Sequence, residues 1–196
     1  MRKFFIILIA LGWLPCLLTL SQAHNAHEHG TAKVNIAVEG ARVNLGLESP
    51  LANLLPFEHR PETPEQRLEV QNLALRLRHQ AETLFQLTPA AECRLTKVEL
   101  ESANLEPELL DPEATPEPAL TDDGGNKNSK KAEDHEEHGD LDADFTFLCA
   151  KPENLSGLDI LLFDAWPKIE KIEVQAATPR GQRAATLSPK KHQWSW

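Results

Sequence analysis

Apolar and polar residues alternate along residues 31–49, which is the pattern of strands that bury one face. The pattern is interrupted at Glu39-Gly40-Ala41, where the glycine favours a turn, and then resumes. Residues 31–49 are therefore predicted to form a β-hairpin. Its inward positions are Val34, Ile36 and Val38 in the first strand and Val43, Leu45 and Leu47 in the second.

A helix is predicted to begin after Thr63. Thr63-Pro64-Glu65-Gln66 combines an N-cap threonine, a proline at the first helical position and a glutamine at the third, which together form a capping box. Apolar residues then recur every three or four positions and line one face, and Pro89 is predicted to end the helix. The predicted buried face consists of Val70, Leu73, Leu77, Ala81 and Leu84.

Five further segments have the alternation or the apolar content of strands. They are 94–101, 143–150, 158–163, 171–175 and 184–187. One helix among runs of strands with short turns is typical of the α+β class. We therefore predict an antiparallel sheet of about six or seven strands with one main helix packed on it.

Residues 105–140 have a different composition from the rest of the chain. Prolines, a Gly-Gly pair and charged residues dominate this segment, and almost no apolar residue recurs at a regular spacing. Such a segment cannot bury enough surface to offset its ordering entropy. We predict a disordered, flexible insertion at about 105–140 within a single domain of residues 31–196, preceded by a mobile His-rich N-terminus at 24–30.

The first 23 residues have the features of a secretory signal peptide. Two basic residues precede an apolar run over residues 4–20, and Ser21-Gln22-Ala23 offers small residues for cleavage. A membrane anchor is the competing interpretation, but Gly12 and Pro15 interrupt the run, which is short for a membrane span. We expect cleavage after Ala23 and export of the mature chain.

Cleavage would leave a strongly acidic chain. It would remove two of the 20 basic residues and none of the 30 acidic residues, so the mature 173 residues (196 minus 23) carry a formal charge of −12 (18 minus 30). Such a chain repels phosphate backbones, and no basic patch with interleaved aromatic residues is present. Nucleic-acid binding is therefore disfavoured, whereas cation binding is not.

Two cysteines, Cys93 and Cys149, remain in the mature chain. In an exported protein such a pair is predicted to form a disulfide. The alternative, a catalytic thiol, requires an environment that lowers the thiol pKa, and neither residue has a Cys-x-x-Cys partner or an adjacent histidine. If the strands at 94–101 and 143–150 are neighbours, the disulfide can join them.

Five of the eight histidines lie in two short acidic runs, at 24–29 and 134–140. Zinc sites commonly take two ligands at such close spacings from one segment, and the neighbouring carboxylates attract cations. Neither run alone completes four ligands, so we predict that each supplies part of a site; the alternative is that both are merely solvated. The predicted ligands are His24, His27, His29, His135 and His138, with Glu28 and Glu137.

Copper(II) is an alternative to zinc at the first run. If the signal is cut after Ala23, the free α-amine of His24 lies beside its own imidazole, and such a pair of nitrogens favours copper. His59, a single histidine in a loop with acidic neighbours, is a weaker candidate metal ligand. His79 and His192 are predicted to be solvated.

The sequence contains none of the common signatures of hydrolases or nucleotide-binding enzymes. It lacks Gly-x-Ser-x-Gly, a phosphate-binding glycine loop and His-Glu-x-x-His. The carboxylates of Asp140, Asp142 and Asp144 lack the glycine and glutamate of an EF-hand and are predicted to lie on the solvated side of a strand. We expect a protein that is not an enzyme and has no small-molecule substrate.

Several motifs along most of the mature chain match a known family. They are His27-Glu28-His29-Gly30, Glu48-Ser49-Pro50, Phe57-Glu58-His59, Leu84-Phe85 before Cys93, the His-containing insertion, and Thr178-Pro179-Arg180-Gly181-Gln182. In these residues the chain resembles the ZrgA-type family of zinc-regulated periplasmic proteins. The resemblance implies a periplasmic zinc-binding protein that serves zinc uptake.

The insertion departs from that family because it holds only two histidines. We therefore expect the histidines of the N-terminal run to contribute more of the ligands. From the residues and the resemblance together we expect Zn²⁺ as the ligand and an inner-membrane or envelope transport component as the partner. The alternatives are a copper-binding periplasmic protein and an envelope protein-interaction module in which the histidine runs are incidental.

Overall fold

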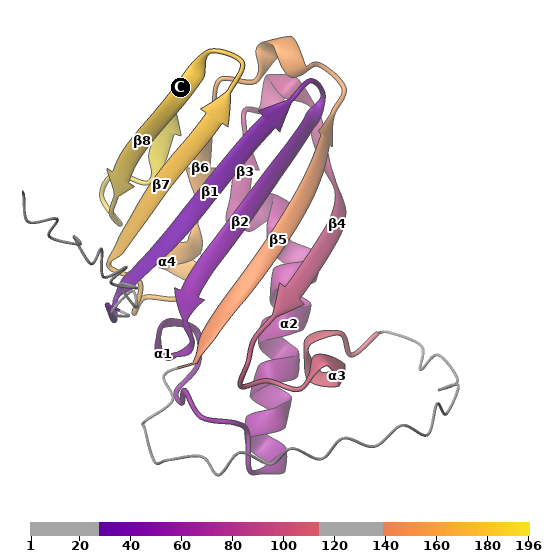
Figure 1. Ribbon diagram of the computed structural model, residues 1–196, viewed down its shortest axis with the longest axis vertical. Helices are drawn as coiled ribbons and strands as arrows, with labels where there is room; N and C mark the ends of the chain where they lie inside the picture. The colour runs from indigo at the N-terminus through magenta and orange to yellow at the C-terminus, as the bar shows by residue number, and fades with distance from the viewer. Residues whose placement is uncertain (1–27, 114–138) are drawn as a thin grey trace, which may run out of the picture.

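The computed structural model describes residues 28–113 and 139–196, which form one large sheet, one long helix and a smaller sheet (Figure 1). The strands are β1 (Thr31–Glu39), β2 (Arg42–Pro50), β3 (Phe85–Leu87), β4 (Cys93–Glu101), β5 (Asp140–Cys149), β6 (Gly157–Ile160), β7 (Lys171–Thr178), β8 (Gly181–Leu187) and β9 (Gln193–Ser195). The α-helices are α1 (Leu51–Leu54), α2 (Pro64–Leu84), α3 (Pro107–Leu110) and α4 (Leu162–Ala165), with 3₁₀ turns at Pro89–Ala91 and Pro152–Asn154.

The large sheet has six strands in the order β4-β5-β2-β1-β7-β8. The predicted hairpin is present as β1 and β2, and Gly40 at the turn has a positive φ of 59°. Every neighbouring pair is antiparallel except β1 and β7, which run parallel. The α+β prediction is confirmed, but the sheet is mixed because the chain crosses through β6 and α4 before it enters β7 beside β1.

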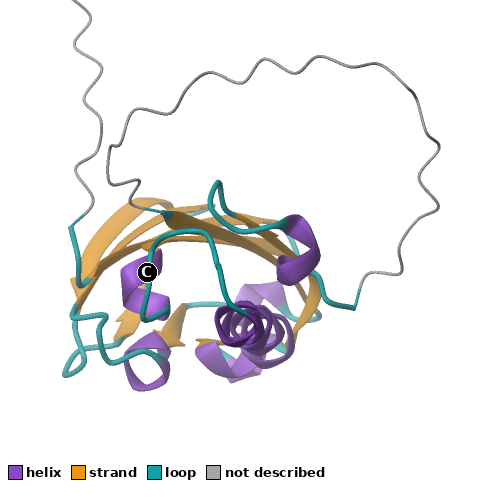
Figure 2. Ribbon diagram, turned by 90° about the horizontal axis from the view of Figure 1, so that it is seen from below, coloured by secondary structure: helices purple, strands orange, loops and turns teal. Residues whose placement is uncertain are grey.

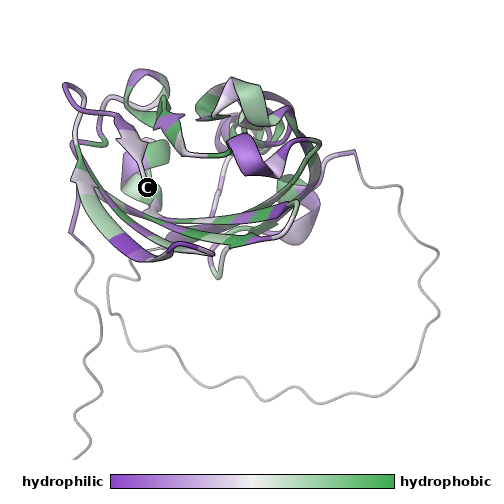
Figure 3. Ribbon diagram, turned by 90° about the horizontal axis from the view of Figure 1, so that it is seen from above, coloured by the Kyte–Doolittle hydropathy of each residue, from purple (hydrophilic) through white to green (hydrophobic). Residues whose placement is uncertain are grey.

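The core lies on the concave side of this sheet, under α2 and the shorter helices (Figure 2). Hydrophobic and hydrophilic positions alternate along the central strands (Figure 3), so β1, β2, β5 and β7 each turn one face to the core. Phe85, Phe145 and Phe147 are among the largest fully buried side chains, and the rings of Phe85 and Phe145 lie 5.0 Å apart. This contact joins the two sheets.

The helix α2 begins as the capping box predicts. The Thr63 hydroxyl accepts a hydrogen bond from the Gln66 backbone amide at 3.2 Å, and the Gln66 side chain accepts one from the Thr63 amide. All five predicted inward residues are buried. The helix ends at Leu84, before Pro89 is reached, because the chain turns extended at Phe85 to pair with β6. No helix in residues 28–113 and 139–196 has the length and apolar content needed to cross a membrane.

The predicted insertion begins later than the composition indicates. Residues 105–113, which we placed in it, include α3, and Leu105, Leu109 and Leu110 are buried. The guanidinium of Arg78 on α2 donates a hydrogen bond to the carbonyl of Leu110 at 3.0 Å and anchors this turn. Residues 114–138 lie outside the described part of the chain.

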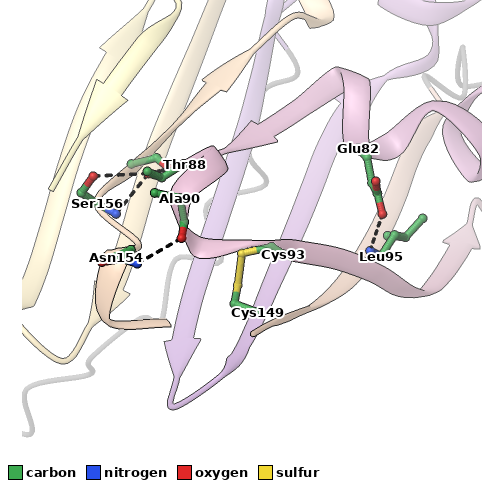
Figure 4. Close-up of a disulfide and its surroundings, with 9 residues drawn as sticks. Glu82, Thr88, Ala90, Cys93, Leu95, Cys149, Asn154 and Ser156 are labelled. Carbon is green, nitrogen blue, oxygen red and sulfur yellow. Dashed lines mark hydrogen bonds between the residues drawn. A yellow bond between two sulfur atoms is a disulfide. The ribbon is translucent and has the colours of Figure 1, made fainter. Parts of the chain in front are cut away.

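The predicted disulfide is present and joins the first residue of β4 to the last residue of β5 (Figure 4). Cys93 and Cys149 lie directly opposite each other in the antiparallel pair. Nearby, the Glu82 carboxylate on α2 accepts a hydrogen bond from the Leu95 amide at 2.8 Å, where β4 has a bulge. The disulfide therefore holds one end of the β4–β5 pair, and the insertion connects the strands at the other end.

Candidate metal centre

The structure describes three of the residues predicted from sequence as metal ligands, namely Glu28, His29 and His59. His24, His27, His135, Glu137 and His138 lie outside the described residues. Their placement in a site stays a prediction. The contacts of the described residues nevertheless show where each histidine run joins the folded domain.

His29 lies immediately before β1, and its Nε2 atom is 3.0 Å from Oε1 of Glu58. The histidine side chain is 58% exposed and the glutamate 22% exposed, so the pair lies at the surface with the carboxylate partly sheltered. Glu58 was not predicted from the sequence as a ligand, although it lies beside His59. Imidazole nitrogen and carboxylate oxygen are both zinc ligands, so this pair supplies two donor types at one place.

The backbone at His29 is held by a buried asparagine. Asn53 of α1 is 3% exposed, and its side-chain oxygen accepts a hydrogen bond from the Gly30 amide at 2.8 Å. Its amide nitrogen donates to the carbonyl of Thr31 at 3.0 Å. Because Asn53 bonds on both sides of the first residue of β1, the position of His29 is fixed by the folded core.

The loop that carries Glu58 also contacts the end of the insertion. The Asn104 side chain donates a hydrogen bond to the Glu58 carbonyl at 3.1 Å. Gly139, the first described residue after the insertion, packs against both: a Cβ built on it would lie 2.8 Å from the Glu58 carbonyl oxygen. The Gly139 carbonyl in turn accepts a hydrogen bond from the Leu51 amide at 2.8 Å. Thus the two histidine runs join the domain on either side of Glu58.

Replacing Gly139 with alanine should lower the free energy of unfolding by about 1–3 kcal/mol, because an added methyl group has no room beside the Glu58 carbonyl oxygen and the side chains of Asn104 and Leu51. Urea denaturation monitored by circular dichroism measures this change. Gly46→Ala is the matched control, since its nearest contact is a single carboxylate oxygen of Asp144 at 3.1 Å that can rotate away. Equal stability of the Gly139→Ala variant and the wild type would show that this junction is loosely packed.

Glu28 has a different environment from its neighbour His29. Its carboxylate lies 3.1 Å from the ammonium of Lys171 at the start of β7. The hydrogen bond that Lys171 donates to Glu28, together with a second that it donates to Glu173, raises the pKa of Lys171. Glu28 would have to give up its contact with Lys171 to bind a metal, whereas Glu58 already lies beside an imidazole.

His59 is exposed and is oriented by its own loop. Its Nδ1 atom lies 2.8 Å from the Arg60 carbonyl, and since a carbonyl only accepts, Nδ1 must carry the proton. The ring packs at 5.4 Å from that of Phe57. This tautomer leaves the lone pair on Nε2, which is the state that a metal requires.

No group of three or more histidine, cysteine or carboxylate residues in 28–113 and 139–196 is arranged to hold a metal ion. The pair of His29 and Glu58 is therefore an incomplete ligand set within the described residues. A tetrahedral zinc site needs further ligands, and the histidines of the two runs are the candidates.

The opposite, solvated face of the sheet carries a row of carboxylates. Glu101, Asp142 and Glu48 lie side by side on β4, β5 and β2, and Asp144 lies next along β5. This confirms the prediction for Asp142 and Asp144, which are exposed, whereas Asp140 is half-buried. Asp142 is exposed, but the neighbouring strands desolvate it in part, and this raises its pKa most, followed by repulsion from Glu48, Asp140, Asp144 and Glu101.

Replacing Asp142 with asparagine should stabilise the protein at pH 7. A pKa raised on folding means that the ionised carboxyl is disfavoured in the native state, so the gain exists at neutral pH and disappears as the pH falls through that raised pKa. We expect an increase in Tm of about 1–3 °C. Scanning calorimetry at pH 7 and pH 3 tests this, with the exposed Glu69→Gln on α2 as control. A lower Tm at pH 7 would contradict it.

The prediction that His192 is solvated is wrong. It is half-buried rather than fully solvated, and its Nδ1 atom bonds to the carboxylate of Asp159 on β6. Gln193 donates to the other oxygen of the same carboxylate at 3.1 Å. The pairing of β6 with β9 brings these residues together, so no local pattern could have indicated the contact. His79 is exposed, as predicted, and lies 3.2 Å from Glu113.

Comparison with known proteins agrees with the resemblance found in the sequence. A search of curated proteins found none that matches the chain. The family model described as "ZrgA family zinc uptake protein" matches residues 26–196, which includes both cysteines, the insertion and every described element. This protein therefore belongs to the ZrgA family of zinc uptake proteins.

Proposed function

We propose that this protein is a periplasmic zinc-binding protein that captures Zn²⁺ on its histidine and acidic segments and delivers it to a membrane transport component, without catalysing a reaction. Membership of a zinc uptake family supports zinc as the ligand. The observation that carries the proposal is the pair of His29 and Glu58, 3.0 Å apart, at the point where both histidine runs join the domain.

The proposed ligand set draws on both runs. His24, His27 and His29 come from the first, and His135 and His138 from the second, with Glu28 and Glu137 as carboxylates from the runs. We add Glu58 to this set because it lies beside His29 and is sheltered by its loop. Ligands on two segments that meet at a fixed point lose less entropy on binding than two independent tails would.

Titration of the mature protein with Zn²⁺, in competition with a chromophoric chelator, tests this proposal. His29→Ala should weaken zinc binding by at least about tenfold, because one nitrogen ligand is lost. His79→Ala is a matched control, since His79 also lies 3.2 Å from a glutamate and is 57% exposed, but on α2. It should leave zinc affinity unchanged.

A second variant addresses the whole ligand set. Replacing five histidines with alanine should abolish high-affinity binding of zinc. The five are His24, His27, His29, His135 and His138. Unchanged stoichiometry and affinity in this variant would overturn the proposal. Protein for these titrations is purified without a His-affinity tag, so that every histidine counted belongs to the native chain.

A further inference from the structure

The C-terminal part of the chain is cationic in an otherwise acidic protein. Residues 174–196 contain four basic residues and no acidic residue, whereas residues 1–173 contain the other 16 basic and all 30 acidic residues. The four cations are Arg180, Arg183, Lys190 and Lys191, and all are exposed. They lie in β8 or close to its two ends. We call β8 with these four residues the cationic edge.

None of these four cations pairs with an aspartate or glutamate among the described residues. Arg183, Lys190 and Lys191 form no ion pair with any residue in 28–113 or 139–196, and the guanidinium of Arg180 donates to the Trp196 carbonyl at 3.4 Å. The acid nearest in register, Glu173 on β7, lies opposite Thr186 and is paired with Lys171 at 3.3 Å. Ion pairs within the described part of the chain therefore do not neutralise the positive charge of this edge.

The two edges of the large sheet differ in their free backbone groups. At β4, side chains of α2 occupy the outer backbone: Glu82 accepts from the Leu95 amide and Arg78 donates to the Val98 carbonyl. A bulge between Leu95 and Lys97 also breaks the regular edge. Both features protect an edge from pairing with another chain.

The outer edge of β8 lacks this protection (Figure 1). It pairs with β7 in unbroken register along its whole length, and Ala184, Ala185 and Thr186 give it small side chains. In the described part of the chain, the backbone of 182–187 makes no hydrogen bond on its other side. An extended segment can therefore add to β8 as a further strand.

We propose that the cationic edge is a docking site for an acidic, extended segment of a partner protein, which pairs with β8 and places its carboxylates near the four cations. Charge decides between this occupant and a second copy of the chain. Two β8 strands paired with each other would bring their unpaired cations together, and like charges across a pair are unfavourable. An acidic strand brings the opposite charge and also increases the association rate.

None of the proposed zinc ligands belongs to the cationic edge. A failed zinc titration and a failed docking test can therefore be distinguished. The probe is a short fluorescent peptide that alternates threonine and valine and has two glutamates at each end, titrated into the mature protein and followed by anisotropy. The same peptide with lysines in place of the glutamates is the charge control. NMR amide shifts locate the bound peptide.

The acidic peptide should bind, shift the amides of 181–187 and lose affinity as salt is added. The triple variant Arg183→Glu, Lys190→Glu and Lys191→Glu should bind it at least about tenfold more weakly. Reversal of three cations near the other edge, Arg94, Lys97 and Lys151, is the matched control and should change affinity less than about twofold.

Five outcomes would overturn the proposal. No binding of the acidic peptide would mean that the cations only protect the edge from aggregation. Equal binding of the lysine peptide, or amide shifts confined to other strands, would remove the role of charge or of β8. Preferential binding of phosphatidylglycerol vesicles would indicate a membrane surface instead. A concentration-dependent dimer that buries β8 would indicate a second copy.

Discussion

Replacing both Cys93 and Cys149 with alanine should lower the free energy of unfolding by about 4 kcal/mol. The bridged residues are 56 positions apart, and closing a loop of that length restricts the unfolded chain by this amount in the chain-entropy model. Urea denaturation of the double variant and the wild type measures the difference. The double replacement leaves no free thiol that could form dimers.

Zinc affinity of the same variant should be unchanged. The disulfide lies at Cys149, the last residue of β5, while the junction with the insertion lies at the first, Asp140, roughly 30 Å away along an extended strand. Wild type treated with a reductant is the control and should match the variant in stability. A loss of less than about 1 kcal/mol would show that the β4–β5 pairing alone restricts the unfolded loop.

Zinc affinity should fall by about a thousandfold between pH 7.5 and pH 5 if two histidines bind the ion. Imidazole ordinarily titrates near pH ~6.5, and each histidine ligand must lose its proton to bind, which costs about 30-fold at pH 5. Competition titrations at the two pH values, with a chelator calibrated at each, measure this change. The physical cause is competition between the proton and the metal for the same lone pair.

A carboxylate site would behave differently. Carboxylates are ionised at both pH values, so a site made of Glu28, Glu58 and Glu137 alone would lose little affinity. A fall of less than about tenfold would therefore contradict the histidine ligands. The variant lacking the five histidines of the two runs is the control, and its residual weak binding should depend little on pH.

Most elements of the fold could be predicted from short-range patterns. The alternation in residues 31–49 predicted β1 and β2, the capping box at Thr63 predicted the start of α2, and three-to-four spacing predicted its buried face. Where a prediction was wrong, contacts between residues distant in sequence determine the observed structure. The helix ends at Leu84 because β3 pairs with β6, and residues 105–113 fold because their leucines are buried beside α2.

The candidate site was predicted only in part. Residue type and spacing indicated His29 as a ligand, but Glu58 was missed because nothing in its own neighbourhood indicates a contact with His29. That contact depends on Asn53, which holds the start of β1 against α1. Predicting it requires the position of α1, which packing determines.

By itself the sequence determined the α+β class, the pairing of the two cysteines and the family, because these depend on residue type and on spacing between near neighbours. Only the tertiary structure decided that β1 and β7 run parallel, that Glu58 meets both His29 and Gly139, and that the C-terminal cations lie in or beside β8, an edge strand among the described residues. These features depend on which distant segments the core brings together. Burial of apolar surface drives that packing, and because it is non-directional, no local sequence pattern indicates which segments will meet.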